Sequence, residues 1–100
     1  MSRRVEWSSS AIDDFDLAIA HIAQDNPAAA RKVALGIGRS ASALGTHSTG
    51  RPGRIPGSYE KSVTGLPYVI AYAVPDDTRI VVLRVIHTSR DWPRGGWPQA

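Results

Sequence analysis

Three residues near the end of the chain could serve chemistry rather than packing. Arg84 and His87 interrupt the apolar run at 79–87, and Arg90 follows three positions later. A guanidinium binds phosphate or carboxylate oxygens in a bidentate manner. An imidazole is the side chain that ordinarily exchanges a proton near neutral pH. We therefore take Arg84, His87 and Arg90 as the candidates for a catalytic or anion-binding site.

A second basic group lies earlier in the chain. Residues 46–58 contain two prolines and three glycines, which excludes a helix and predicts a long loop. Long loops in small domains are often functional, and this one carries Arg51 and Arg54. Lys61 follows in a short predicted strand at 59–63. No Gly-Lys-Ser or Gly-Lys-Thr follows the glycines, so the loop is not a phosphate-binding P-loop.

The strongest structural signal lies between residues 65 and 92. Two runs rich in Val, Ile, Leu and Tyr flank the break Pro75-Asp76-Asp77-Thr78, a pattern that predicts a β-hairpin. Both runs are nearly continuous in apolar character, which favours central places in a sheet. Arg84 and His87 are three positions apart, so on a regular strand they point to opposite faces.

Two amphipathic helices are predicted before the hairpin. A short strand at 3–7 leads to serines at 8–10 that can cap a helix, and Asn26-Pro27 starts a second helix that ends near Gly45. The acidic trio Asp13, Asp14 and Asp16 is interpreted as helix-start chemistry rather than a metal site. The predicted fold is α+β, with the order β-α-α-β-β-β, a three-stranded antiparallel meander and both helices on one face of the sheet.

Composition narrows the functional classes. A chain of 100 residues forms one domain, and the absence of cysteine excludes a disulfide framework and a thiolate zinc site. No signal peptide or membrane-spanning run is visible, so we expect a cytoplasmic protein that contacts no membrane and needs no metal or cofactor. Residues 39–100 carry eight basic and four acidic side chains, against four and five in residues 1–38. This asymmetry permits a nucleic-acid or acidic-protein partner.

Four segments together resemble the RelE/ParE superfamily of toxins from type II toxin–antitoxin systems. They are Ile19-Ala-His-Ile-Ala-Gln-Asp-Asn-Pro-Ala-Ala-Ala, Gly50-Arg-Pro-Gly-Arg-Ile-Pro-Gly, Pro67-Tyr-Val-Ile-Ala-Tyr and Leu83-Arg-Val-Ile-His-Thr-Ser-Arg-Asp-Trp-Pro. The resemblance implies a single toxin domain at 1–93, followed by a tail at 94–100. It also implies a cognate antitoxin whose C-terminal segment wraps the toxin, giving a hetero-oligomeric complex.

The resemblance leaves two activities open. ParE-like members poison DNA gyrase, whereas RelE-like members cleave mRNA on the ribosome. In a nuclease, Arg84 and Arg90 would clamp phosphate oxygens and His87 would transfer a proton. RelE-like sites often use lysine or a C-terminal tyrosine for that step, and this chain has two lysines and no tyrosine after the last predicted strand. We therefore favour a ParE-like gyrase inhibitor, with the mRNA endonuclease as the alternative.

Structural roles compete with each of these assignments. His87 could simply end a strand, hydrogen-bonded to backbone, and Arg84 could pair with Glu60 or with an antitoxin carboxylate. Arg51, Arg54, Lys61 and Trp92 are the expected RNA- or antitoxin-binding residues. Trp97 could anchor a partner, although the tail could equally fray beyond a Trp92 that packs back on the core. A small basic RNA-binding or adaptor module is a third hypothesis, which an adjacent antitoxin reading frame would argue against.

Overall fold

The computed structural model describes residues 2–89 and residue 97. Seven elements follow one another along the chain. They are β1 (Arg4–Trp7), α1 (Ser9–Asp25), α2 (Pro27–Leu44), β2 (Arg51–Pro52), β3 (Tyr59–Ser62), β4 (Tyr68–Asp76) and β5 (Arg79–His87). The predicted α+β class and element order are confirmed, with one addition: the long loop contains the two-residue strand β2.

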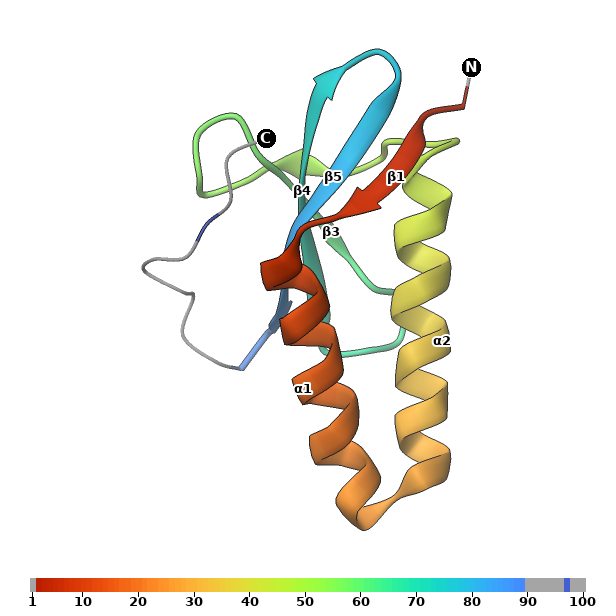
Figure 1. Ribbon diagram of the computed structural model, residues 1–100. Coiled ribbons are helices and arrows are strands. Elements are labelled where there is room, and N and C mark those ends of the chain that lie inside the picture. The colour runs from red at the N-terminus through yellow and green to blue at the C-terminus, as the bar shows by residue number, and fades with distance from the viewer. Residues whose placement is uncertain (1, 90–96, 98–100) are drawn as a thin grey trace.

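The strands form one mixed sheet in the order β1-β5-β4-β3-β2. All neighbours are antiparallel except β1 and β5, which pair in parallel from Arg4 opposite Arg79 to Trp7 opposite Val82. β4 and β5 therefore occupy internal positions, as their continuous apolar runs predicted. The two helices lie side by side next to this sheet (Figure 1).

The chain leaves the sheet at Ser8, immediately after β1. Its backbone N–H still donates to the carbonyl of Val82, while its hydroxyl donates to the carbonyl of Leu83 and accepts from the N–H of Ala11. Ser8 is thus both the last contact of β1 with β5 and the N-cap of α1. This capping role confirms what the serine run predicted, and it sets the direction in which α1 crosses β5.

The hydrophobic core lies between the helices and one face of the sheet. Ile70, Tyr72, Ile80 and Val82 from β4 and β5 pack with apolar residues of α2, which include Ile37 and Leu44. All of these residues are almost fully buried, so they supply most of the apolar area removed from water.

Gly36 lies in the middle of α2, although glycine weakens helices, and close packing explains its place. A Cβ atom at this position would lie 2.5 Å from Cδ1 of Leu66, in the turn before β4. The glycine therefore permits close approach of the helix to that turn. Gly45 ends α2, as predicted, but in a right-handed conformation with φ −63°. It admits the backbone of β1, because its Cβ would lie 2.5 Å from the carbonyl oxygen of Arg3.

The β4–β5 hairpin has a shorter connection than the sequence predicted. Asp76 still pairs with Arg79, so the turn consists of Asp77 and Thr78. The register shifts between Ala73 and Asp76, where Pro75, which lacks an N–H, lies in a bulge.

The carboxylate of Asp76 closes this turn. It accepts hydrogen bonds from the hydroxyl and the backbone N–H of Thr78, and lies 3.4 Å from the guanidinium of Arg79. The Thr78 hydroxyl and then its N–H lower the pKa of Asp76 from 3.8 to about 2. A carboxyl whose pKa is lower in the folded state than in the unfolded state stabilises the fold at pH values above its unfolded-state pKa. That contribution is lost as the pH falls from 3.8 toward 2.

Removal of the Thr78 hydroxyl should therefore raise the pKa of Asp76. In Thr78→Ala we expect the pKa to move up toward 3.8 without reaching it, because the backbone donor and Arg79 remain. The measurement is the pH dependence of the Asp76 side-chain carbon shift by NMR. Thr78→Ser is the matched control, since it keeps the hydroxyl and should titrate like the native protein. Equal titration of the alanine and serine variants would contradict this account.

Candidate functional site

Arg84, the central candidate residue, is held by a carboxylate of α1. Its Nε lies 2.7 Å from Oδ2 of Asp14, and its Nη2 lies 2.8 Å from Oδ1. Both side chains are 17% exposed, so this bidentate pair is largely shielded from water. The hydrogen bonds to Asp14 raise the pKa of the Arg84 guanidinium further above its ordinary value. Arg84 is therefore a permanently charged group whose hydrogen bonds are already directed at an acid of the same chain.

The same carboxylate also completes the edge of the sheet. β1 ends opposite Val82, so the part of β5 that follows has no neighbouring strand on that side within the described part of the chain. Oδ2 of Asp14 accepts the backbone N–H of Val85 at 3.0 Å and so replaces a strand partner there. Asp14 thus joins α1 to β5 through a backbone and a side-chain contact.

Two sequence-based interpretations are corrected by this pair. The partner of Arg84 is Asp14 rather than Glu60. The acidic trio does not serve the start of α1, because the helix begins at Ser9 and its first turn contains no acidic residue. A signal for Asp14 was present in the sequence: it lies three positions after the buried Ala11, whereas Asp13 and Asp16 fall on the exposed face of the helix.

Trp97 also contacts this region. The guanidinium carbon of Arg84 lies 5.9 Å from the centroid of the Trp97 ring, within the range of a cation–π interaction. Trp97 is half-buried in this position. It therefore packs onto the domain in this structure, whereas the sequence suggested that it would fray with the tail or anchor a partner.

His87 ends β5 on the other face of the sheet from Arg84. Residues 84 to 87 pair in regular register with 71 to 68, so no bulge brings the two side chains to one face. The imidazole packs edge-on against Tyr68, with ring centroids 5.1 Å apart. Its Nδ1 lies 3.1 Å from the backbone nitrogen of Ser89, which donates to it. This geometry matches the structural role of a histidine that caps the end of a strand.

The basic loop is held to the sheet by two buried groups. The backbone N–H of Arg54 donates to Oε2 of Glu60 at 2.8 Å, and the N–H of Gly50 donates to the hydroxyl of Tyr72 at 2.9 Å. Glu60 is only 8% exposed. A Cβ on Gly53 would lie 3.2 Å from the Glu60 carboxylate, so a small residue is needed where the loop crosses it. Sequence reasoning missed both anchors.

The loop arginines project from this anchored segment. The Arg51 side chain is 72% exposed and its Nη2 lies 3.9 Å from Oε1 of Glu60, the longest of the ion pairs in the part of the chain described. The backbone register aligns Arg51, Glu60, Ala71 and Arg84 across four strands. Arg51 and Arg84 thus share one sheet face.

Lys61 is not brought into that row. Lys61 pairs opposite Ile70, a core residue, and therefore belongs to the helix-covered face. Arg90 and Trp92 lie outside the described residues. Within residues 2–89 and 97, no cluster of three or more His, Asp or Glu side chains could hold a metal ion. No helix in the same ranges is long and apolar enough to cross a membrane.

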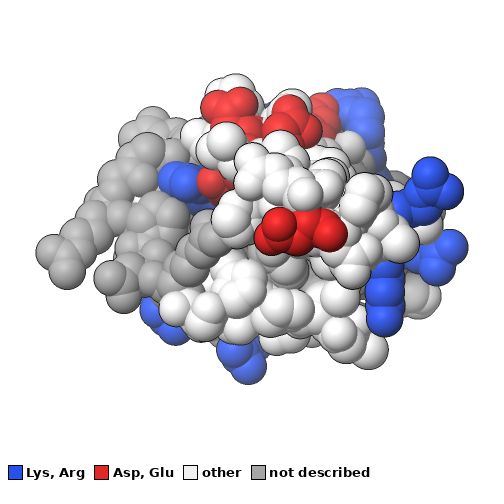
Figure 2. All heavy atoms as spheres, turned by 90° about the horizontal axis from the view of Figure 1, so that it is seen from below, with Lys and Arg blue, Asp and Glu red and all other residues white. Residues whose placement is uncertain are grey.

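Charge is divided sharply between the two helices. α1 carries four acidic residues and no basic one, whereas α2 carries three basic residues and no acidic one. Viewed from below, most acidic side chains lie toward the upper edge and the centre of the molecule, whereas most basic side chains lie along its right and lower edges (Figure 2). The helix pair α1–α2 thus offers oppositely charged surfaces to any partner.

The fold and the sequence together define a class of toxin. The family model described as "ParE toxin of type II toxin-antitoxin system, parDE" matches residues 5–92 of this chain. A protein of Sinorhizobium fredii named as a toxin, Y4kP, is 38% identical over 96 residues, which are 94% of this chain and 98% of that protein. The chain therefore belongs to the ParE toxin family, within the RelE/ParE superfamily, and is a toxin of a type II toxin–antitoxin system.

Solved structures agree at the level of the fold. The chromosomal ParDE toxin–antitoxin system of P. aeruginosa contains a chain with a TM-score of 0.79 and 22% identity. That match covers 88% of this chain and 98% of the other. The toxin–antitoxin complex RelBE2 of Mycobacterium tuberculosis gives a TM-score of 0.62 and 20% identity, covering 87% and 99%. The resemblance inferred from the four sequence segments is confirmed.

Loss of the Asp14 charge should destabilise the fold. Asp14→Asn leaves one oxygen to serve both Arg84 and the N–H of Val85, so we expect the free energy of unfolding to fall by about 2 kcal/mol. Urea unfolding at neutral pH measures the change. Asp13→Asn, one position away on the exposed face of α1, is the matched control and should change stability by less than about 0.5 kcal/mol. Similar losses in both variants would mean that the ion pair contributes nothing specific.

Proposed function

We propose that this toxin acts as a ParE-type inhibitor of DNA gyrase rather than as a ribosome-dependent ribonuclease. The observation that carries the proposal is the match of residues 5–92 to the ParE toxin model. Gyrase poisoning is the activity that membership of the ParE branch implies. The alternative, mRNA cleavage, depends on whether the basic residues at the end of β5 can work together on a phosphate.

The engagement of Arg84 supports the non-enzymatic proposal. Stabilising a phosphorane requires cationic donors aimed at the place where charge develops in the transition state. Two guanidinium nitrogens of Arg84 instead point at Asp14, 2.7 and 2.8 Å away. Releasing Arg84 to a substrate would leave a shielded carboxylate without its partner, which is costly.

The position of His87 supports the same conclusion. A general acid or base must lie within hydrogen-bond reach of the group whose proton it transfers. His87 and Arg84 extend from opposite faces of β5, so a phosphate bound by one is separated by the sheet from the other. In addition, Nδ1 of His87 already accepts the N–H of Ser89.

We further propose that a cognate antitoxin binds this chain and blocks it. The solved relatives come from toxin–antitoxin systems, ParDE in one case and the RelBE2 complex in the other. The proposed contact residues are Arg51, Arg54, Lys61 and Trp92. Arg51 suits this role best, since its exposed guanidinium has only a long contact with Glu60. An acidic antitoxin segment would therefore gain a charge-assisted hydrogen bond with little competition.

The target is tested in vitro with two assays in parallel. The protein is added to DNA gyrase acting on relaxed plasmid, and separately to a translating extract in which new mRNA 5′ ends are mapped. We expect loss of supercoiling or accumulation of gyrase–DNA cleavage complexes, with mRNA left intact. Toxin preincubated with excess antitoxin is the control, and it should leave gyrase active.

Codon-phased mRNA cuts that require ribosomes, with gyrase unaffected, would overturn the gyrase proposal. In that case Arg84→Lys and His87→Asn, made singly, would show whether either residue takes part in cleavage. Arg84→Lys keeps the positive charge but removes the bidentate fork, so its effect would separate phosphate clamping from overall charge.

The proposed antitoxin contact is tested by neutralising one arginine at a time. Arg51→Gln should weaken the complex with the cognate antitoxin about tenfold, because it removes an exposed cation without disturbing the buried anchors of the loop. Isothermal titration calorimetry measures the affinity. Arg31→Gln, an equally neutralising change at an exposed site on α2, is the matched control. An equal loss in both variants would indicate long-range attraction rather than contact at Arg51.

A further inference from the structure

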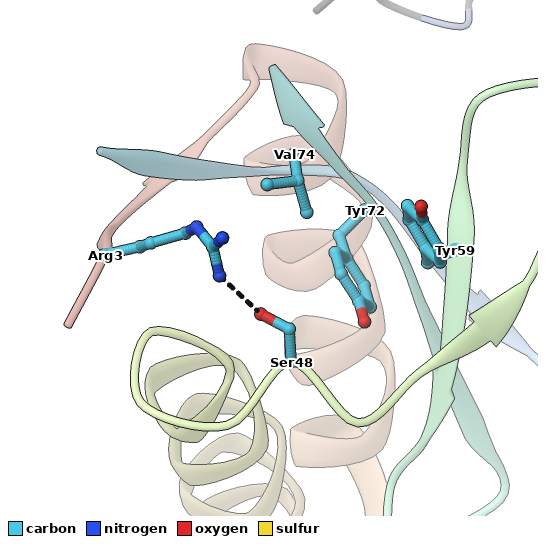
Figure 3. A pocket seen from close by; sticks show the side chains of 5 residues that line it. All are labelled: Arg3, Ser48, Tyr59, Tyr72 and Val74. Carbon is cyan, nitrogen blue, oxygen red and sulfur yellow. Dashed lines mark hydrogen bonds between the residues drawn. The ribbon is translucent and has the colours of Figure 1, made fainter. Parts of the chain in front are cut away.

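A small cavity lies between Arg3, which precedes β1, the strands β3 and β4, and the start of the basic loop. It has a volume of about 240 Å³ and is lined by Arg3, Ser48, Tyr59, Tyr72 and Val74. In the close view, the guanidinium of Arg3 and the hydroxyl of Ser48 point toward one another, with the Tyr72 ring standing beside them (Figure 3). None of the residues proposed above for gyrase, RNA or antitoxin lines this cavity.

Arg3 enters the cavity without an acidic partner. It forms no ion pair with any carboxylate in the described part of the chain, and its only side-chain hydrogen bond there joins Nη1 to Oγ of Ser48 at 3.5 Å. Its Nε is buried and finds no hydrogen-bond partner among residues 2–89 and 97. A buried charged donor with an unmet hydrogen bond is costly, and native structures normally supply an acceptor. The neighbouring Arg4 illustrates the contrast, because it pairs with Glu6 at 2.9 Å.

The end of α2 does not supply the missing acceptor. Helix C-terminal carbonyls attract cations, so they are the obvious alternative partners for Arg3. The carbonyl of Leu44 accepts the hydroxyl of Ser48, however, and that of Gly45 accepts the backbone N–H of Arg3. The carbonyls of residues 42 and 43 also accept backbone N–H groups of the following turn. These groups are satisfied without the guanidinium.

Tyr72 offers a second donor to the same cavity. Its hydroxyl oxygen accepts the N–H of Gly50, while its proton has no acceptor among the described residues. Burial raises the pKa of the Tyr72 hydroxyl above its ordinary value, so the group stays protonated and able to donate. The ring of Tyr59 stacks on that of Tyr72 at a centroid distance of 5.6 Å and fixes its orientation.

We propose that this cavity is a carboxylate-binding site, which takes the side chain of an aspartate or glutamate from a partner protein. Arg3 would donate from its guanidinium and Tyr72 from its hydroxyl, while Val74 and the tyrosine rings would contact the methylene part of the side chain. Ser48 directs its proton to Leu44, so it positions Arg3 rather than the ligand. The volume accommodates one acidic side chain.

The charge of the site favours a carboxylate over a phosphate. Of the described residues that line the cavity, Arg3 alone is basic, so a single negative charge is balanced. The nearby end of α2 carries partial negative charge, which disfavours a dianion. A nucleic-acid backbone presents phosphates in series and is bound by several basic residues together, which this cavity lacks.

The test uses the full chain and small probes of matched shape. Acetate is titrated into ¹⁵N-labelled protein at constant ionic strength, with acetamide as the uncharged control, and the Nε–H signal of Arg3 is followed by NMR. We expect acetate to shift this signal and the Gly50 amide saturably, and acetamide to leave both in place. A capped peptide with one aspartate should do the same, and its asparagine counterpart should not.

Variants assign the effect to the two donors. Arg3→Gln should abolish the acetate-dependent shift of the Gly50 amide, and Tyr72→Phe should weaken binding about tenfold, since one hydrogen bond to a charged group is lost. Arg4→Gln is the matched control, because it neutralises an exposed arginine at the next position in the chain and should bind acetate normally.

Three results would overturn the proposal. They are equal shifts with acetate and acetamide, an acetate shift that persists in Arg3→Gln, and binding of inorganic phosphate in the absence of acetate binding. The last would assign the cavity to a phosphate-bearing ligand such as nucleic acid. None of them bears on gyrase inhibition, since the cavity and the proposed target are tested independently.

Discussion

The fold depends on one carboxylate placed at an unfinished strand edge. β1 pairs with β5 only as far as Val82, so the second half of β5 would expose unpaired backbone groups next to α1. Asp14 fills that place: it accepts the N–H of Val85 and holds Arg84 by two hydrogen bonds. A helix and a strand edge are thereby joined without a further strand. The same contact that completes the sheet also directs two guanidinium nitrogens of Arg84 at an acid of the same chain.

The basic loop is stabilised in a similar way, because buried acceptors on the sheet hold this otherwise irregular segment in place. Its N–H groups at Gly50 and Arg54 find the hydroxyl of Tyr72 and the carboxylate of Glu60, so the loop keeps a defined path despite its glycines and prolines. A surface of this kind presents charge at a fixed place while its scaffold stays rigid, which suits recognition of a partner.

Much of the fold was predictable because it rests on local patterns. The serine cap at Ser8, the helix boundary at Asn26 and the internal hairpin all follow from residue types and periodicity, and each is found in the structure. The site was less accessible. Asp14 and Glu60 gain their roles from residues 70 and 6 positions away, so their partners depend on tertiary packing. Sequence alone assigned Asp14 to the helix start and offered Glu60 as the partner of Arg84.

The parallel pairing of β1 with β5 affects how the toxin folds during its synthesis. The first strand finds its neighbour among residues 79–82, so the sheet closes only when most of the chain has been made. Contacts between distant segments carry a large loop-closure cost and slow the search for the native state. Until then β1 has no strand to pair with. During synthesis, the nascent toxin therefore lacks the β1–β5 pair of its sheet until residues 79–82 have been added.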